Sequence, residues 1–113
     1  MSDVTLSDHD CGQPWVGDLN ELVQFADRGI VSKTLVDCPK AKLVLFGMKT
    51  GQSLSGHAAG TPATIQVLQG AGTITLGKTD YEGTPGSIYY MPAGQYHALK
   101  STDDLVFLLN LFR

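Results

Sequence analysis

The sequence predicts a single all-β domain, a barrel or sandwich of short strands. At 113 residues the chain has room for one hydrophobic core. Its thirteen glycines are many for this length and suit a fold with frequent tight turns. Short β-branched or alternating segments, such as residues 73–76, are separated by turn signals about every ten residues, which is typical of sandwiches and barrels.

The strands are expected from Ile30 to near the C-terminus. Two of them, residues 43–46 and 105–109, carry apolar residues on both faces, so neither face can lie in water. A small barrel has one interior, and the outer face of these strands must therefore be covered by a helix and by a second subunit. The pattern thus predicts a homodimer. The other expected strands are residues 30–36, 63–69, 73–76 and 87–91, and a strand through His97 and Leu99.

One short helix is expected near the N-terminus, from Asp18 to Asp27. Asp18 is suited to cap its first turn, and Glu21 follows at the spacing of a capping box. Gly29 can adopt the left-handed conformation that ends a helix. The helix should pack its apolar stripe on the outside of the barrel, and that stripe is Leu19, Leu22, Val23 and Ala26.

Residues 1–16 are expected to form an irregular N-terminal segment, and residues 17–113 the barrel domain. The run Asp8–Cys11 contains metal-binding side chains, but neighbours in sequence do not easily converge on one ion, so a solvated tail is expected. The two cysteines, Cys11 and Cys38, are too few for a disulfide framework. They are expected to be reduced and partly buried.

Composition narrows the classes of partner. The net charge of −3 offers no basic surface for a nucleic-acid backbone. No apolar run reaches the length of a membrane span, and the first ten residues lack the basic end and apolar core of a signal peptide. The sequence therefore predicts a cytoplasmic protein that binds neither nucleic acid nor membrane.

Two glycine-bracketed segments stand at the centre of the chain. The first has Gly51, five residues, His57, and then Gly70. The second has Gly86, five residues, Pro92-Ala93-Gly94, two residues, His97, three residues and Ser101. Fifteen residues separate the two segments.

These segments resemble the two signature motifs of the cupin superfamily, and the chain looks like a small bacterial-type, RmlC-like cupin with a single conserved barrel. The resemblance implies a double-stranded β-helix. It also implies a divalent metal held by three histidines and a glutamate. Two of those four positions are Ala59 and Ala63 here, and Ser101 stands where the second motif has asparagine. The metal-binding motif is therefore degenerate, with His57 and His97 as the remaining ligands.

The resemblance implies that positions 57, 59 and 63 face the barrel interior and that His97 lies on a facing strand. The two imidazoles are then expected to lie near each other in the barrel mouth, each partly solvated. Barrel mouths are common ligand sites. The predicted ligand-binding residues are His57, His97, Tyr89, Tyr96, Ala59 and Ala63.

Three functions follow from this site. The first is a small-molecule-binding protein without a full metal site. The second is a metal-dependent oxygenase or isomerase with an incomplete site, His57 and His97 binding Zn, Ni, Fe, Mn or Cu. The third is a non-catalytic structural or sensing module. Whether the protein is an enzyme stays open. His57 and His97 are the candidate catalytic dyad, since coupled imidazoles titrate near neutral pH.

Overall fold

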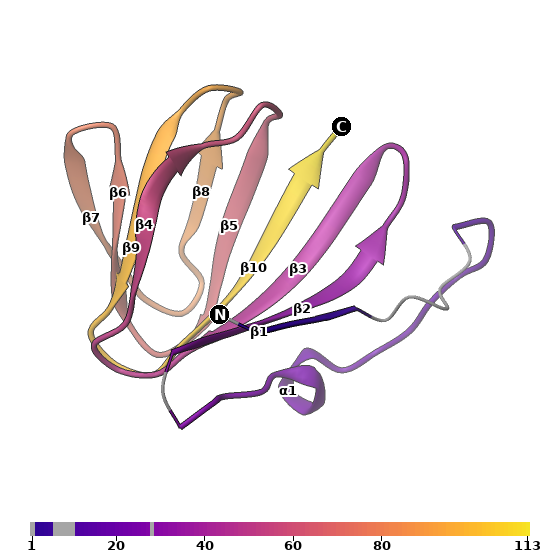
Figure 1. The fold of residues 1–113 in the computed structure, drawn as a ribbon, viewed down its shortest axis with the longest axis horizontal. Coiled ribbons are helices and arrows are strands. Elements are labelled where there is room, and N and C mark those ends of the chain that lie inside the picture. The colour runs from indigo at the N-terminus through magenta and orange to yellow at the C-terminus, as the bar shows by residue number, and fades with distance from the viewer. Residues whose placement is uncertain (1, 6–10, 28) are drawn as a thin grey trace.

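The computed structural model describes residues 2–5, 11–27 and 29–113, with the backbone alone for residues 2–5, 55 and 57. Two sheets face each other and form a barrel (Figure 1). The six-stranded sheet has the order β1-β2-β3-β10-β5-β8, and the four-stranded sheet has the order β4-β9-β6-β7. The strands are β1 (Ser2–Thr5), β2 (Ile30–Asp37), β3 (Ala41–Met48), β4 (Ser53–Ala58), β5 (Ala63–Gln69), β6 (Gly72–Leu76), β7 (Thr79–Gly83), β8 (Ile88–Met91), β9 (Tyr96–Ser101) and β10 (Leu105–Phe112). This confirms the predicted all-β fold.

Alternating burial fixes which side chains enter the barrel. In β5, Ala63, Ile65 and Val67 are buried, whereas the residues between them are partly exposed. The inward side chains of both sheets meet in one core, as the period of two along a strand requires. The buried core residues are Ile30, Val44, Phe46, Met48, Ala63, Ile65, Val67, Ile74, Met91, Leu99, Leu105 and Phe107.

A second apolar cluster lies on the outer face of the six-stranded sheet, as the two-sided strands predicted. This outer cluster consists of Leu35, Leu45, Val106 and Leu108. Residues 18–25, named here the covering segment, lie across it and pack Leu19, Leu22 and Val23 against it. The chain therefore covers part of its own outer sheet face.

The predicted helix is shorter than expected. Helix α1 (Leu19–Leu22) begins after Asp18, whose Oδ1 accepts a hydrogen bond of 2.9 Å from the Asn20 N–H. It ends after one turn because Val23 is extended, at φ −64° and ψ 138°. The following residues run along β3, where the Gln24 carbonyl occupies the space that a Cβ at Gly47 would need. Packing on the sheet thus replaces the helical turns expected as far as Asp27.

The N-terminal region departs from two expectations. Residues 2–5, within the segment predicted to be irregular, form β1 and pair in parallel with β2. Cys11 and Cys38 are not reduced thiols but form a disulfide, with their Cα atoms 5.8 Å apart. Their separation of 27 residues concealed this proximity. Residues 8–10 of the candidate ligand run lie outside the described residues. Within the described part of the chain, no helix has the length and apolarity to span a membrane.

Candidate functional site

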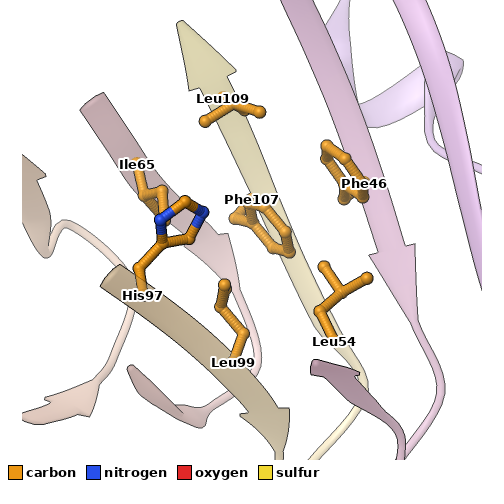
Figure 2. Close-up of a pocket in the computed structure, with 7 residues that line it drawn as sticks. All are labelled: Phe46, Leu54, Ile65, His97, Leu99, Phe107 and Leu109. Carbon is orange, nitrogen blue, oxygen red and sulfur yellow. The ribbon is translucent and has the colours of Figure 1, made fainter. Parts of the chain in front are cut away.

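A cavity of about 140 Å³ lies inside the barrel between the two sheets. Figure 2 shows its lining side chains converging from strands of both sheets. Phe46 and Phe107 form one wall, with parallel rings whose centroids are 4.6 Å apart. The cavity is lined by Phe46, Leu54, Ile65, His97, Leu99, Phe107 and Leu109.

His97 is the one polar side chain in this lining, among the residues whose side chains are described. It is 5% exposed, so the expectation of a partly solvated imidazole was wrong. Its Nδ1 lies 3.2 Å from the Gln95 carbonyl oxygen. Because a carbonyl oxygen can only accept, Nδ1 carries the proton in this bond. The bond fixes the ring orientation and presents the imidazole to an otherwise apolar cavity.

The backbone register brings His57 opposite His97. Strands β4 and β9 are hydrogen-bonded neighbours in one sheet, not facing strands as expected, and they pair His57 with His97. They also pair Leu54 with Leu99, so between the two pairs two residues of β4, 55 and 56, lie opposite one residue of β9, Ala98. This offset is a β-bulge, and it allows both Leu54 and His57 to oppose cavity-lining residues. The His57 side chain lies outside the described atoms.

Gly56 and Tyr96 lie in contact beside this bulge. A Cβ at position 56 would overlap the Tyr96 ring, so only glycine leaves that ring in place. Tyr96 is 48% exposed. The ring therefore lies on the surface of β4, beside His97 in sequence, and not in the cavity lining.

The remaining predicted ligand-binding residues lie apart from the cavity lining. The Tyr89 hydroxyl donates to the Glu82 carbonyl at 3.2 Å, which directs it toward β7. Ala63 is 1% exposed within the core. The Ala59 carbonyl accepts a hydrogen bond of 2.8 Å from Gly94 N–H and so ties the two motifs together. Of the predicted residues with described side chains, the cavity includes His97.

Sequence reasoning missed the six apolar lining residues. The alternating pattern of the strands was the available signal, since residues two apart on a strand share a face. Ile65 and Leu99 lie on strands that were predicted. The alternating pattern does not show how the strands pair. Strand pairing decides which inward residues meet across the barrel.

The donor set does not fit the family's four-ligand metal site. Ala59 and Ala63 carry no ligand atom. Ser101 is 1% exposed, and its hydroxyl accepts a 2.9 Å bond from Gln52 N–H and donates to a carbonyl of the same turn. Its hydroxyl therefore closes the turn between β3 and β4. Within the described residues, no group of three or more His, Cys, Asp or Glu side chains could hold a metal ion.

A barrel of two facing sheets with this strand order is a double-stranded β-helix. The model of the cupin domain matches residues 44–110, more than half of the chain. The chain therefore belongs to the cupin family. No match was found among the curated proteins.

Solved structures share this fold. A conserved protein of unknown function from Streptococcus pyogenes is 26% identical, with a TM-score of 0.80 over 100% of this chain and 96% of that one. An RmlC-like cupin from Desulfovibrio desulfuricans is 24% identical, with a TM-score of 0.81 over 88% and 97% of the two chains. Salicylate 1,2-dioxygenase from Pseudoaminobacter salicylatoxidans, solved with gentisate, is 13% identical, with a TM-score of 0.71 over 74% and 25%. The second and third likenesses show the fold alone.

Proposed function

We propose that the protein binds a small organic molecule in the barrel cavity, with His97 as its polar contact and without a full metal site. The observation that carries this proposal is the His97 imidazole in a cavity of about 140 Å³ whose other lining side chains, among those described, are apolar. Apolar pockets with a few placed polar groups are the usual small-molecule sites. His57, opposite His97 in the register, is the second proposed contact.

Size and lining limit the ligand to a small ring with one polar group. A cavity of about 150 Å³ lined by Leu, Ile and Phe accommodates benzene. The parallel Phe46 and Phe107 rings offer an aromatic wall, and the imidazole offers one hydrogen-bonding or ionic partner. A phenol or a small cyclic alcohol meets both requirements, whereas a sugar would leave most of its hydroxyls unpaired.

Methyl NMR of the protein tests the proposal, with phenol, cyclohexanol and glucose as probes. Phenol or cyclohexanol should shift the methyl signals of Leu54, Ile65 and Leu99, which line the cavity, and leave Leu45 unchanged. Leu54→Phe should fill the cavity and abolish the shifts. Leu43→Phe is the matched control, since Leu43 is also half-buried but packs against the outer cluster. The proposal fails if neither phenol nor cyclohexanol moves the cavity signals, or if glucose moves them as strongly.

A weak two-histidine metal site is the second candidate. The register that pairs His57 with His97 supports it, since opposed residues of an antiparallel pair are close neighbours. Zinc, nickel, copper, iron or manganese would bind through two imidazoles and solvent, more weakly than in a site with three or four protein ligands. If the protein is a metal-dependent enzyme of this kind, protein purified without chelator should contain metal, and mass spectrometry measures the metal content. A non-catalytic sensing role would need the cavity but not the metal.

We also propose that the protein is a homodimer. The outer cluster is already buried within the chain, at 9% exposure or less, and the apolar side chains that support this proposal are Ile88 and Tyr90 on edge strand β8, which are 62% and 61% exposed. Burying such side chains is worth about 25 cal/mol per Å². Light scattering that gives a monomer mass near 12.1 kDa at micromolar concentration would reject this assembly.

We also propose that the protein is located in the cytosol. There the Cys11–Cys38 disulfide would meet reducing thiols.

A further inference from the structure

The Cys11–Cys38 disulfide closes a loop around the covering segment. The segment continues into β2, and β2 ends at Asp37, next to Cys38. The disulfide returns the chain from the end of β2 to Cys11, seven residues before Asp18. Both flanks of the covering segment are thus attached to β2, one by the peptide chain and one by the disulfide.

The covering segment has little internal structure to hold it in place. Helix α1 is four residues long, and helices of fewer than about twelve residues are marginal by themselves. It contacts the sheet through apolar packing, through a side-chain hydrogen bond of 2.9 Å donated by Gln69 to Asn20, and through the Lys49 ammonium, 5.2 Å from the centre of the Phe25 ring. Upstream, β1 adds a short parallel edge pairing with β2. The position of this segment therefore depends on the disulfide more strongly than the position of a longer helix would.

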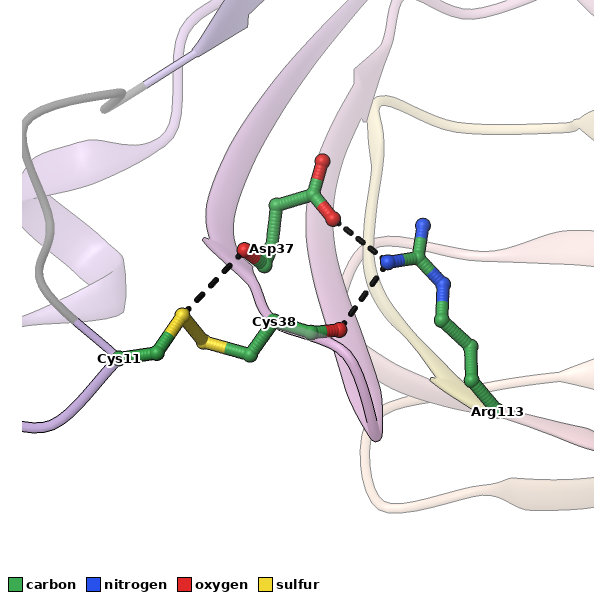
Figure 3. Close-up of a disulfide and its surroundings, with 4 residues drawn as sticks. All are labelled: Cys11, Asp37, Cys38 and Arg113. Atoms are coloured by element: carbon green, nitrogen blue, oxygen red, sulfur yellow. Dashed lines mark hydrogen bonds and ion pairs between the residues drawn. A yellow bond between two sulfur atoms is a disulfide. The ribbon is translucent and has the colours of Figure 1, made fainter.

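The two half-cystines are held unequally, as Figure 3 shows. Cys38 is half-buried and its backbone is fixed, because its carbonyl accepts from Arg113 at 3.1 Å and its N–H donates to Ala41 at 2.9 Å. Arg113 also forms an ion pair with Asp37 at 2.6 Å. Cys11 is exposed, and its bonded sulfur, which has no proton to donate, lies 3.5 Å from the Asp37 carbonyl oxygen. Breaking the S–S bond would free Cys11 and leave Cys38 in place.

We infer that Cys11–Cys38 is a reversible modification site, where exchange with a dithiol releases the covering segment from the outer cluster. A thiolate of the dithiol attacks the exposed Cys11 sulfur, and the S–S electron pair leaves with Cys38, which takes a proton. The second thiol of the dithiol then attacks the dithiol's other sulfur, which is bonded to Cys11 in the mixed disulfide, and Cys11 leaves and takes a proton to become a thiol. The dithiol supplies two electrons and two protons and becomes a disulfide.

Release would expose an apolar surface that the oxidised protein covers. Leu19, Leu22 and Val23 would leave, and the outer cluster would face solvent. The oxidation state of one bond would thereby set whether this sheet face is available for association.

Hydrogen exchange of the full-length protein, oxidised and incubated with dithiothreitol, tests the inference. Mass spectrometry of alkylated protein first confirms that both thiols are free. We expect amide exchange in residues 19–25 to rise about tenfold or more, because the loop constraint is lost. Residues 72–83, which form β6 and β7, are the internal control and should not change.

The double variant Cys11→Ser/Cys38→Ser should show fast exchange without dithiothreitol and no further response to it. Three outcomes would overturn the inference: a disulfide that dithiothreitol cannot reduce in the folded protein, full reduction with exchange changed less than twofold, and equal acceleration in residues 72–83. If the variant does not fold, the wild-type comparison still decides.

Discussion

The Asp104 carbonyl oxygen lies where a side chain at Gly70 would begin. Gly70 has φ +76°, and a Cβ built on it would overlap the Asp104 carbonyl group. The end of β5 and the turn between β9 and β10 therefore touch backbone to backbone. This contact explains why glycine closes the first motif.

Gly70→Ala should destabilise the protein severely. The left-handed conformation costs about 1–2 kcal/mol for a residue with a Cβ, and the overlap with a backbone carbonyl adds to this. We expect a total above about 3 kcal/mol by urea denaturation. Gly86→Ala is the matched control, since Gly86 has φ +95° with no heavy atom within 4 Å of a Cβ, and it should cost only the conformational part. Equal losses at both positions would contradict the role of the contact.

Asp104 should make stability depend on pH. Its carboxylate accepts from the Thr50 N–H at 2.9 Å, from the Thr50 hydroxyl at 3.0 Å, and from Lys49 at 3.4 Å. These bonds, the Thr50 backbone bond first, hold the pKa of Asp104 below its ordinary value of 3.8. A depressed folded-state pKa gives stability that is present above the ordinary value and is lost as pH falls through the lowered one.

Asp104→Asn should therefore be less stable than wild type at pH 7, with a difference that shrinks below about pH 4. Urea denaturation at several pH values measures it. Asp27→Asn, which changes an exposed carboxylate outside this turn, should show no such convergence. A difference between Asp104→Asn and wild type that is constant from pH 7 to pH 3 would reject the linkage.

His97→Ala should cost about 1–3 kcal/mol, because the buried Gln95 bond is lost and the cavity grows. This is larger than the loss expected from the sequence alone, since the imidazole is buried. The enlarged cavity should also admit a bulkier apolar probe, such as toluene, while phenol binding weakens. Fluorescence-monitored unfolding and methyl NMR measure the two effects. A loss of stability without any change in probe binding would assign His97 a purely structural role.

Gly56→Ala should displace the Tyr96 ring from the surface of β4. The ring is half-exposed and free to turn outward, so we expect a loss of about 1 kcal/mol, smaller than at Gly70. In a Tyr96→Ala background the same change should cost less, and the double-mutant cycle measures that coupling. Additive effects would show that the overlap with Tyr96 is not what excludes a side chain at position 56.

The sequence predicted the fold well because motif spacing and strand alternation are local signals. Strand β5 was predicted with its correct bounds, and the covered outer face followed from residues 43–46 and 105–109. Contacts between residues far apart in the sequence could not be predicted from these local signals. The helix ends at Leu22 because the following residues pack on Gly47, and Cys11 and Cys38 lie together in the fold although 27 residues apart in sequence.

The candidate site was predicted only in part, for the same reason. His97 could be located from its motif, but the cavity wall depends on which inward residues of two sheets meet. The bulge in β4 depends on the pairing with β9, and nothing in residues 53–58 alone reveals it. Tyr89 and Tyr96 stood near the motif in sequence, yet strand geometry turns them toward β7 and the β4 surface.

The two alanines at the family's ligand positions differ in how far they could revert. Ala59 is partly exposed and follows the end of β4, so a larger residue there has solvent to extend into. Ala63 is 1% exposed and packed in the core, where a glutamate would bury both volume and charge. A metal-ligating residue could therefore be introduced at position 59 by a single substitution. At position 63 the surrounding core residues would first have to change.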